Sequence, residues 1–292
     1  MYYFAYGLVR FFSFLPLGVL YLFADLIYFF VYYVKGYRKK VVLQNLVIAF
    51  PEKTEKERQR IAKDFYHKFI DTFIETIKFF SWDIKEINKR FEASMKDVEA
   101  QFCHGRPIHI IGMHNFNWEF ANWWISARTP VPFLGIYLPV GNRHFDRMIK
   151  QMRSKYGTVL IPATDFKSRY ESVRNQHHIL GVVADQSPAD PRNAWWIDFF
   201  GRKTAFVRGA ERGAIAARAS VIFVHFYRVR RGHYRLDTRP FSDDASKLKP
   251  GDMTRAYAKF VEESVRSHPS DYLWSHRRWK HDWKEDFGSI TI

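Results

Sequence analysis

Residues 108–119 read Ile108-His109-Ile110-Ile111-Gly112-Met113-His114-Asn115-Phe116-Asn117-Trp118-Glu119. The apolar run before Gly112 is typical of a buried strand, and the glycine ends it. His114 follows shortly after this break. The order therefore predicts that its imidazole lies at the carboxyl end of a strand, where open α/β sheets build their ligand sites.

An acidic residue follows this histidine in the pattern H-x-x-x-x-E. In an ideal helix a spacing of five turns two side chains about 140° apart. Glu119 can therefore meet His114 only if the histidine stands at or before the start of the helix. A carboxylate placed there can hold one ring nitrogen and leave the other free to take a proton. Because no serine or cysteine lies close by in sequence, the pattern favours a general base that activates a hydroxyl of the substrate. The alternative is a hydrogen-bonded core histidine.

The composition limits the classes of protein. The chain has 292 residues, enough for one large domain or two small ones, and a formal net charge of +16. Such a charge favours an anionic partner: membrane headgroups, a phosphorylated substrate or carrier, or nucleic acid. The single cysteine, Cys103, excludes an intramolecular disulfide and a thiolate zinc cluster. Histidine spacings suited to a metal are also missing, so we predict no metal site.

The amino-terminal segment is almost uncharged. Its only charges up to residue 34 are Arg10 and Asp25, and the 24 residues from Phe11 to Val34 are long enough to cross a hydrocarbon core. Basic residues crowd positions 35–40, which by the positive-inside rule predicts a cytoplasmic location for the remainder. Asp25 costs about 2.5–3.5 kcal/mol on insertion scales unless it faces protein or water. We therefore predict a membrane anchor over 1–36, either spanning or lying in the interface, followed by a domain at 37–292.

Strand-like and helix-like segments alternate after this anchor. Thr54-Glu55-Lys56-Glu57 resembles a capping box that opens a long helix toward Phe80. Further strands are predicted at 131–137, 158–162, 178–184, 220–227 and 234–238, and further helices at 142–155, 165–175, 206–219 and 253–267. The alternation predicts an α/β fold: a single mixed-sheet domain with helices on both faces, preceded by the membrane-anchoring helix.

Several further blocks carry a resemblance to a known family. They are N-L-x-x-A-F-P-E at 45–52, Ala184-Asp185-Gln186, Phe199-Phe200-Gly201 with Thr204-Ala205-Phe206, and Tyr272-Leu273-Trp274-Ser275-His276-Arg277-Arg278-Trp279-Lys280. In this order, and with the H-x4-E block, they run almost end to end. The chain resembles the late acyltransferases of lipid A biosynthesis, the lauroyl and myristoyl transferases, which belong with the H-x4-D/E glycerolipid acyltransferases.

The resemblance implies an enzyme on the cytoplasmic side of the bacterial inner membrane. Such an enzyme moves a fatty acyl chain from acyl carrier protein, or sometimes coenzyme A, to a hydroxyl of a lipid A precursor. It implies that His114 deprotonates the acceptor and that Glu119 fixes the tautomer of the imidazole. The alkoxide attacks the acyl thioester directly, so no covalent acyl-enzyme and no cofactor beyond the co-substrate is expected.

The tetrahedral oxyanion of such a reaction needs hydrogen-bond donors. The candidates are Arg169 and the backbone N–H groups around Asn115. Asp185 and Gln186 stand at a predicted strand end, where a site is expected. Both could equally cap the next turn.

Four further residues have two interpretations each. Glu211 is either a second acid for His114 or a partner in a helix salt bridge. Arg277, Arg278 and Lys280 either bind acceptor phosphates or touch anionic headgroups, and the tryptophans among them favour an interfacial role.

Three other functions stay open at this point. A related acyltransferase could act on another glycolipid, an aminolipid or a lysophospholipid. A nucleic-acid-binding protein is suggested by the charge, but many aromatic residues lie in the uncharged anchor rather than among the basic clusters. A catalytically inactive lipid-binding relative is disfavoured because His114 and Glu119 are both present.

Overall fold

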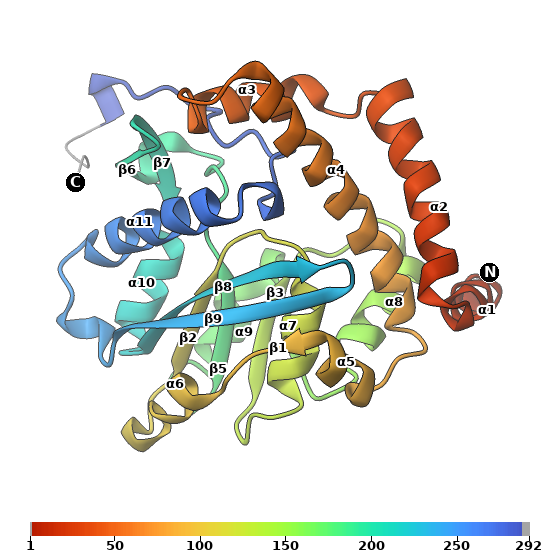
Figure 1. Ribbon diagram of the computed structural model, residues 1–292. Coiled ribbons are helices and arrows are strands. Elements are labelled where there is room, and N and C mark those ends of the chain that lie inside the picture. Colours follow the sequence, from red (N-terminus) through yellow and green to blue (C-terminus); the bar gives the residue numbers. More distant parts are fainter. Residues whose placement is uncertain (1, 288–292) are drawn as a thin grey trace.

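The computed structural model describes residues 2–287. A seven-stranded sheet with the order β1-β9-β8-β2-β5-β3-β4 forms its centre (Figure 1). The strands of this sheet are β1 (Phe91–Glu92), β2 (Ile108–Gly112), β3 (Phe133–Tyr137), β4 (Val159–Pro162), β5 (Ile179–Val183), β8 (Ser220–Arg230) and β9 (His233–Ser242). Neighbours are parallel except β8 and β9, which form an antiparallel hairpin. The predicted mixed-sheet α/β fold is confirmed.

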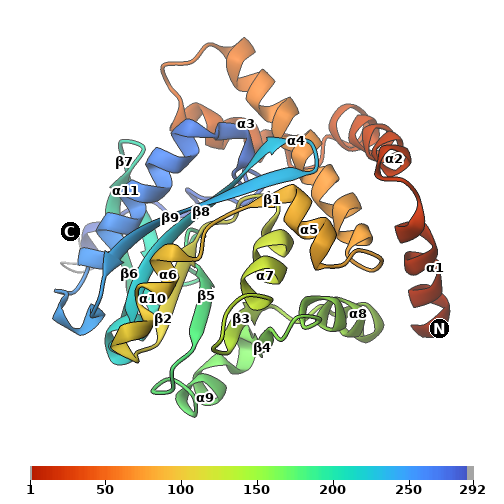
Figure 2. The ribbon, with the colours of Figure 1, turned by 60° about the horizontal axis from the view of Figure 1, so that its bottom comes forward.

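Helices cover both faces of the sheet (Figure 2). They are α3 (Lys39–Ala49), α4 (Glu55–Lys78), α5 (Ile84–Arg90), α6 (Lys96–Glu99), α7 (Trp118–Ser126), α8 (Arg143–Arg153), α9 (Phe166–Glu171), α10 (Gly209–Ala216) and α11 (Asp252–Ser267). Because successive side chains of a strand point to opposite faces, β2 contributes Ile111 to the core beneath α4 and α11 and Ile110 to the core beneath α7. Both faces of the central strands are therefore buried, as their continuous apolar runs predict.

The capping box at the start of α4 is formed as predicted. The Thr54 hydroxyl accepts the backbone N–H of Glu57, and the Glu57 carboxylate accepts the backbone N–H of Thr54. Two of the unpaired N–H groups at this helix end are satisfied in this way.

The predicted helix at 206–219 is wrong at its start. Phe206 belongs to strand β7 (Arg202–Val207), which pairs with β6 (Ala194–Phe199) in a separate antiparallel hairpin, and the helix α10 begins only at Gly209. Phe206 stands opposite Trp195 in this hairpin. Cross-strand packing of two aromatic side chains favours the strand, and it involves residues outside the local sequence window.

The uncharged stretch from Phe11 to Val34 is not one helix. It is divided between α1 (Tyr2–Phe14) and α2 (Leu17–Phe29), with a π-helical segment at Phe30–Val34. Pro16 stands between them, because a proline ring cannot continue a helix through the preceding turn. Residues Leu17–Val34 remain long and apolar enough to cross a membrane by length and composition, and only 22% of this segment is buried.

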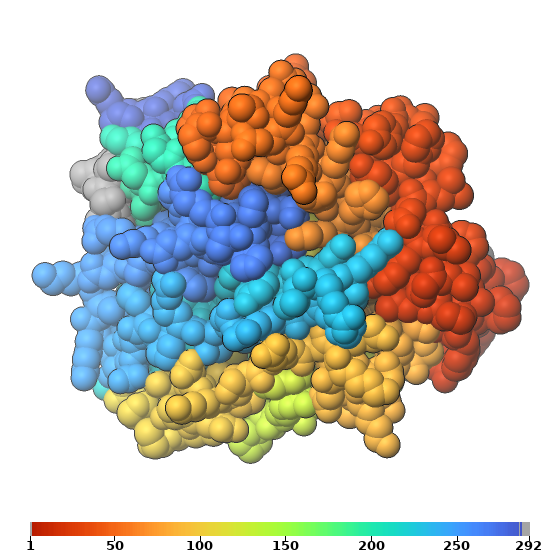
Figure 3. Space-filling model, viewed as in Figure 1, coloured from red at the N-terminus to blue at the C-terminus, as the bar shows by residue number. Residues whose placement is uncertain are grey.

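Both amino-terminal helices lie against the domain and form one edge of the molecule (Figure 3). On α2, Asp25 faces protein: its carboxylate pairs with Arg231 from the β8–β9 hairpin at 2.6 Å, and Arg231 also contacts Asp71 of α4. The outer side of the segment carries exposed large apolar side chains, including Phe4, Phe11, Phe14, Leu22, Phe23, Leu26, Phe29 and Phe30. An apolar surface of this kind marks an interaction with lipid or protein.

Candidate active site

The register of the parallel strands β2 and β5 brings His114 and Asp185 together. Gly112 of β2 stands opposite Val183 of β5, so His114 and Asp185 follow matched positions at the same edge of the sheet. Nδ1 of His114 lies 2.7 Å from Oδ1 of Asp185, and the same oxygen accepts the backbone N–H of His114 at 3.1 Å. A β-carbon at Gly112 would lie 3.2 Å from Cγ2 of Val224 on β8, so the glycine permits close packing just before the turn.

The electrostatics of this pair favour a charged carboxylate beside a basic imidazole. Burial lowers the pKa of His114, but the charge and hydrogen bond of Asp185 outweigh it, and the net pKa is raised. Burial raises the pKa of Asp185, yet the contact with His114 and the charge of Arg278 leave its net pKa lowered. Because Asp185 occupies Nδ1 and the His114 side chain keeps 22% exposure, the opposite ring nitrogen is the one placed to exchange a proton.

Glu119 does not hold His114. It stands in the first turn of α7, and its two carboxylate oxygens share the Nε–H of Arg153, the last residue of α8, at 3.0 and 3.1 Å. Nη2 of Arg153 also donates to Oε1 at 2.5 Å. The indole N–H of Trp118 adds a further bond at 3.0 Å. Residues 114–117 precede the helix and Asn117 caps it, while the Glu119 side chain points toward α8. The expected contact is thus replaced by one with Asp185.

The backbone donors around Asn115 are already used. The N–H of Asn115 donates to the carbonyl of Met113 at 2.8 Å, and the N–H of Phe116 donates to the carbonyl of Asp271 at 3.3 Å. The Asn115 side chain is buried, and its amide donates to the carbonyl of Phe226 at 3.1 Å. The backbone N–H groups of Asn115 and Phe116 are thus both engaged in holding the loop. Gln186 follows Asp185 on the same loop and is partly buried.

The carboxyl-terminal motif packs directly on this loop. Leu273 donates its N–H to the carbonyl of His114 at 3.0 Å, and Asn115 and Tyr272 form an antiparallel bridge. The side-chain amide of Asn45 on α3 donates to the carbonyls of Trp274 and His276 at 2.8 and 2.7 Å. Two of the sequence motifs, at 45–52 and 272–280, therefore meet here to hold the segment against His114.

Arg278 is the member of the basic run that joins the site. It is buried, stacks over the ring of Phe206 at 4.1 Å and donates Nη1 to the carbonyl of Ala205 at 2.8 Å. Its Nε and Nη2 are buried and have no hydrogen-bond partner within residues 2–287. Arg277 and Lys280 are exposed instead. The three cations thus divide into one buried group and two surface groups.

His276 is a site residue to which the sequence patterns assigned no role, although it lies within the carboxyl-terminal motif. Its Nε2 accepts the backbone N–H of Ser187 at 3.0 Å, next to the loop of Asp185. Burial, and then the charge of Arg278, lower the pKa of His276 to about 4, so this ring is neutral at physiological pH. Arg153 was missed as well, because nothing in the local sequence links it to Glu119.

Two other candidates lie away from His114. Arg169 on α9 pairs at 2.7 Å with Asp165, which stands just before that helix, and 61% of the Arg169 side chain is exposed. Glu211 is buried and accepts the backbone N–H groups of Gly251 and Met253 at 2.9 and 3.1 Å, together with the Thr254 hydroxyl. It caps α11, so the interpretation as a second acid for His114 is not supported by any contact.

An α/β domain that places a histidine beside a buried aspartate at the carboxyl edge of its sheet has its site where open α/β enzymes bind their ligands. The chain belongs to the family of bacterial lipid A biosynthesis acyltransferases, whose model matches residues 1–281. It is therefore an acyltransferase, and the resemblance drawn from the sequence motifs is confirmed.

Curated relatives agree with this assignment. The chain is 24% identical to the lipid A biosynthesis lauroyltransferase of Escherichia coli K12 over 250 residues, which cover 83% of this chain and 79% of the relative. It is 20% identical over 247 residues, with the same coverage, to the lipid A biosynthesis palmitoleoyltransferase of that organism and to a lipid A biosynthesis acyltransferase of Shigella flexneri.

Proposed function

We propose that this protein is a membrane-bound O-acyltransferase that moves a fatty acyl chain from an acyl thioester to a hydroxyl of a lipid A precursor. His114 acts as the general base, and no covalent acyl-enzyme forms. The observation that carries the proposal is the 2.7 Å contact between Nδ1 of His114 and the buried carboxylate of Asp185, in a chain whose family transfers acyl groups. A neutral imidazole held in this way presents a basic Nε2 to a substrate.

The reaction follows from these positions. Nε2 of His114 takes the proton of the acceptor hydroxyl, and the oxygen attacks the thioester carbonyl. The resulting tetrahedral oxyanion collapses, the carbon–sulfur bond breaks, and the imidazolium returns its proton to the thiolate that leaves. The carboxylate of Asp185 stabilises the imidazolium between these steps.

Arg278 is our candidate for stabilising the oxyanion, in place of Arg169. Its Nε and Nη2 are buried without partners within the part of the chain that the structure describes, and its charge acts on Asp185. A preorganised cation of this kind stabilises developing negative charge by a few kcal/mol. Gln186, on the same loop as Asp185, is a candidate for contacting substrate.

Glu119 remains part of the proposal in a different role. Its ion pair with Arg153 joins the first turn of α7 to the end of α8, directly after the loop that carries His114. We assign Glu119 the task of positioning this guanidinium and the loop, whereas Asp185 orients the imidazole.

The amino-terminal residues 1–36 are proposed as the membrane anchor and residues 37–292 as the catalytic domain. The exposed apolar side of α1 and α2 supports attachment to lipid, and the basic residues at 35–40 support a cytoplasmic location at the bacterial inner membrane. The exposed Arg277 and Lys280 suit contact with the anionic membrane surface or with acceptor phosphates. The donor is proposed to be acyl carrier protein or a coenzyme A thioester, with no other cofactor and no nucleic acid partner.

The test is acyl transfer by the detergent-solubilised protein from labelled acyl carrier protein, or from acyl coenzyme A, to a tetra-acyl Kdo-lipid A precursor. The wild type should transfer, and a folded His114→Ala variant should not. Full activity of His114→Ala would overturn the mechanism. Transfer only to another glycolipid, an aminolipid or a lysophospholipid would leave the reaction type intact and replace the acceptor.

A further inference from the structure

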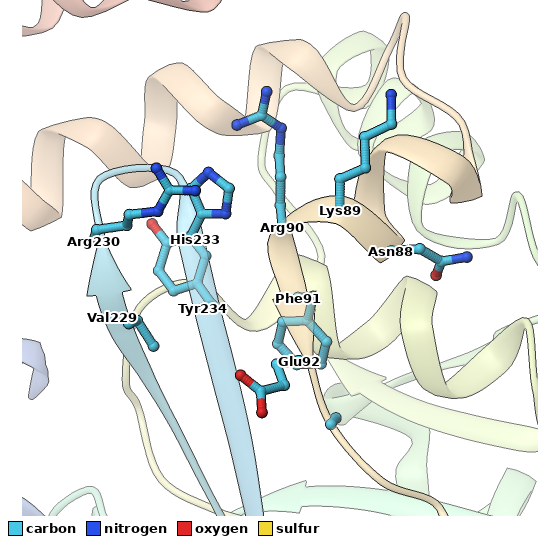
Figure 4. Close-up of a pocket in the computed structure, with 10 residues that line it drawn as sticks. Asn88, Lys89, Arg90, Phe91, Glu92, Val229, Arg230, His233 and Tyr234 are labelled. Carbon is cyan, nitrogen blue, oxygen red and sulfur yellow. The ribbon is translucent and has the colours of Figure 1, made fainter.

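A pocket of about 430 Å³ lies between the end of α5, strand β1 and the tip of the β8–β9 hairpin (Figure 4). None of the residues assigned above to the reaction lines it. Its volume falls in the range of small-molecule sites and would hold a lipid headgroup.

Positive charge gathers around this pocket. Lys89 and Arg90 come from α5, and Arg230 comes from the hairpin. Arg230 forms no ion pair with any residue in 2–287. Nε of Arg90 is buried and makes no hydrogen bond in the same range, although it lies 3.6 Å from Oε2 of Glu86. Glu92 is the one carboxylate in the lining. Its side chain is 73% exposed, and its Oε1 lies 3.6 Å from Nη1 of Arg235. Glu86 is the nearest neutralising group, and it pairs with Lys89 and Arg90 together.

The same positive charges affect the pKa of His233. It lines the pocket at the start of β9. Burial, and then the charges of Arg230 and Arg90, lower the pKa of this histidine. Two guanidinium groups therefore act on one small volume, whose one lining carboxylate, Glu92, is exposed and paired with Arg235. A bound dianion or monoanion would relieve this repulsion.

The pocket also adjoins the apolar amino-terminal helices. A β-carbon on Gly232, at the hairpin tip, would lie 3.3 Å from Cδ2 of Leu17 at the start of α2 and 3.4 Å from Nη1 of Arg90. The end of α1 carries Phe11 and Phe14 with 66% and 64% exposure. The basic pocket thus stands where the exposed apolar surface of α1 and α2 meets the domain.

We propose that this pocket binds the phosphate group of an anionic membrane phospholipid, whose acyl chains lie along the exposed side of α1 and α2. The cations recognise the phosphate, and the neighbouring helices recognise the chains. A nucleic acid would instead need an extended basic stripe along its backbone. This site would place the protein at an anionic leaflet whether or not His114 performs the proposed reaction.

The probe is a short-chain phosphatidylglycerol below its micelle concentration, titrated into the full-length protein in a non-ionic detergent, with the matching phosphatidylcholine as the zwitterionic comparison. The test variant is Lys89→Gln/Arg230→Gln, because both side chains are exposed and their loss leaves the core intact. The matched control is Lys249→Gln/Lys259→Gln, which removes two exposed lysines that do not line this pocket. Glycerol 3-phosphate, which has the phosphate without chains, forms a third arm.

We expect the wild type and the control to bind phosphatidylglycerol more tightly than phosphatidylcholine. The test variant should lose roughly 25-fold in that preference, since each of the two cations near a membrane phosphate contributes about fivefold. Glycerol 3-phosphate should compete weakly. Equal binding of both lipids by the wild type, or an equal loss in the test and control variants, would overturn the site. Glycerol 3-phosphate binding as tightly as the lipid would overturn the role of the apolar helices.

Discussion

Replacing Asp185 by asparagine removes the charge on the carboxylate that contacts His114 while keeping the size of the side chain. The asparagine carbonyl can still accept the backbone N–H of His114, which now donates to Oδ1 of Asp185 at 3.1 Å. The loop should therefore keep its fold. What changes is the partner of Nδ1, which lies 2.7 Å from the carboxylate in the wild type.

Two effects determine how far the rate of the Asp185→Asn variant should fall. A hydrogen bond to a charged group contributes about 1.5–3 kcal/mol, which corresponds to roughly 10- to 150-fold in rate if it is lost only in the transition state. An asparagine can also turn its amide N–H toward Nδ1 and so stabilise the wrong tautomer, which in serine protease triads costs about 10⁴-fold. We therefore expect kcat/KM of Asp185→Asn to fall by roughly 10² to 10⁴.

The pH profile supplies a second readout. A general base must be neutral, so activity should fall as pH drops through the pKa of His114. Because Asp185 raises that pKa against the effect of burial, its removal should move the acidic limb of the profile to lower pH, even as the maximal rate falls. The assay is acyl transfer over a range of pH, beside a thermal melt of each variant.

The control is Asp198→Asn, which changes an exposed aspartate on β6 and should leave the rate and the profile unchanged. A folded Asp185→Asn protein with the rate and acidic limb of the wild type would refute the assignment of Asp185 as the partner of the base.

Other perturbations test the surrounding structure. Glu119→Gln should destabilise the fold by up to about 3 kcal/mol, because it leaves the partly buried Arg153 without its partner. The acidic limb of its pH–rate profile should stay at the wild-type pH. A limb that moved to lower pH, as expected for Asp185→Asn, would instead show that Glu119 acts on the pKa of His114. The pKa of His276 falls to about 4 in the folded protein from 6.5, so the folded state resists protonation and stability should decrease as pH falls from 6.5 toward 4. His276→Gln should reduce the proton uptake on unfolding by about one in that window, measured by denaturant titration at several pH values; an identical pH dependence in both proteins would contradict the burial of this ring. Leu22→Glu/Leu26→Glu, on the exposed side of α2, should weaken vesicle co-sedimentation by more than tenfold, since about 1.5–3 kcal/mol of apolar transfer is lost per leucine; undiminished binding would place the lipid contact elsewhere.

The local sequence was sufficient to predict several parts of this protein. The apolar run before Gly112 defined a strand and placed His114 at its carboxyl end, because a buried strand and its termination are encoded by neighbouring residues. The cap at Thr54 was recognisable for the same reason, and so was the apolar stretch predicted at 11–34, of which residues 17–34 form one apolar helical segment. The motifs spread along the chain were likewise sufficient to indicate an acyltransferase, since each of them is a short local pattern.

Only the tertiary structure decided which carboxylate meets the imidazole. Asp185 lies 71 positions away from His114, and the two come together because β2 and β5 pair in parallel. Glu119, much closer in sequence, is turned away by its ion pair with Arg153 on another helix. Arg278 similarly becomes buried while its neighbour Arg277 stays exposed. The direction in which a side chain points depends on contacts with residues that are distant in sequence and close only in the fold. A local sequence pattern does not contain those contacts.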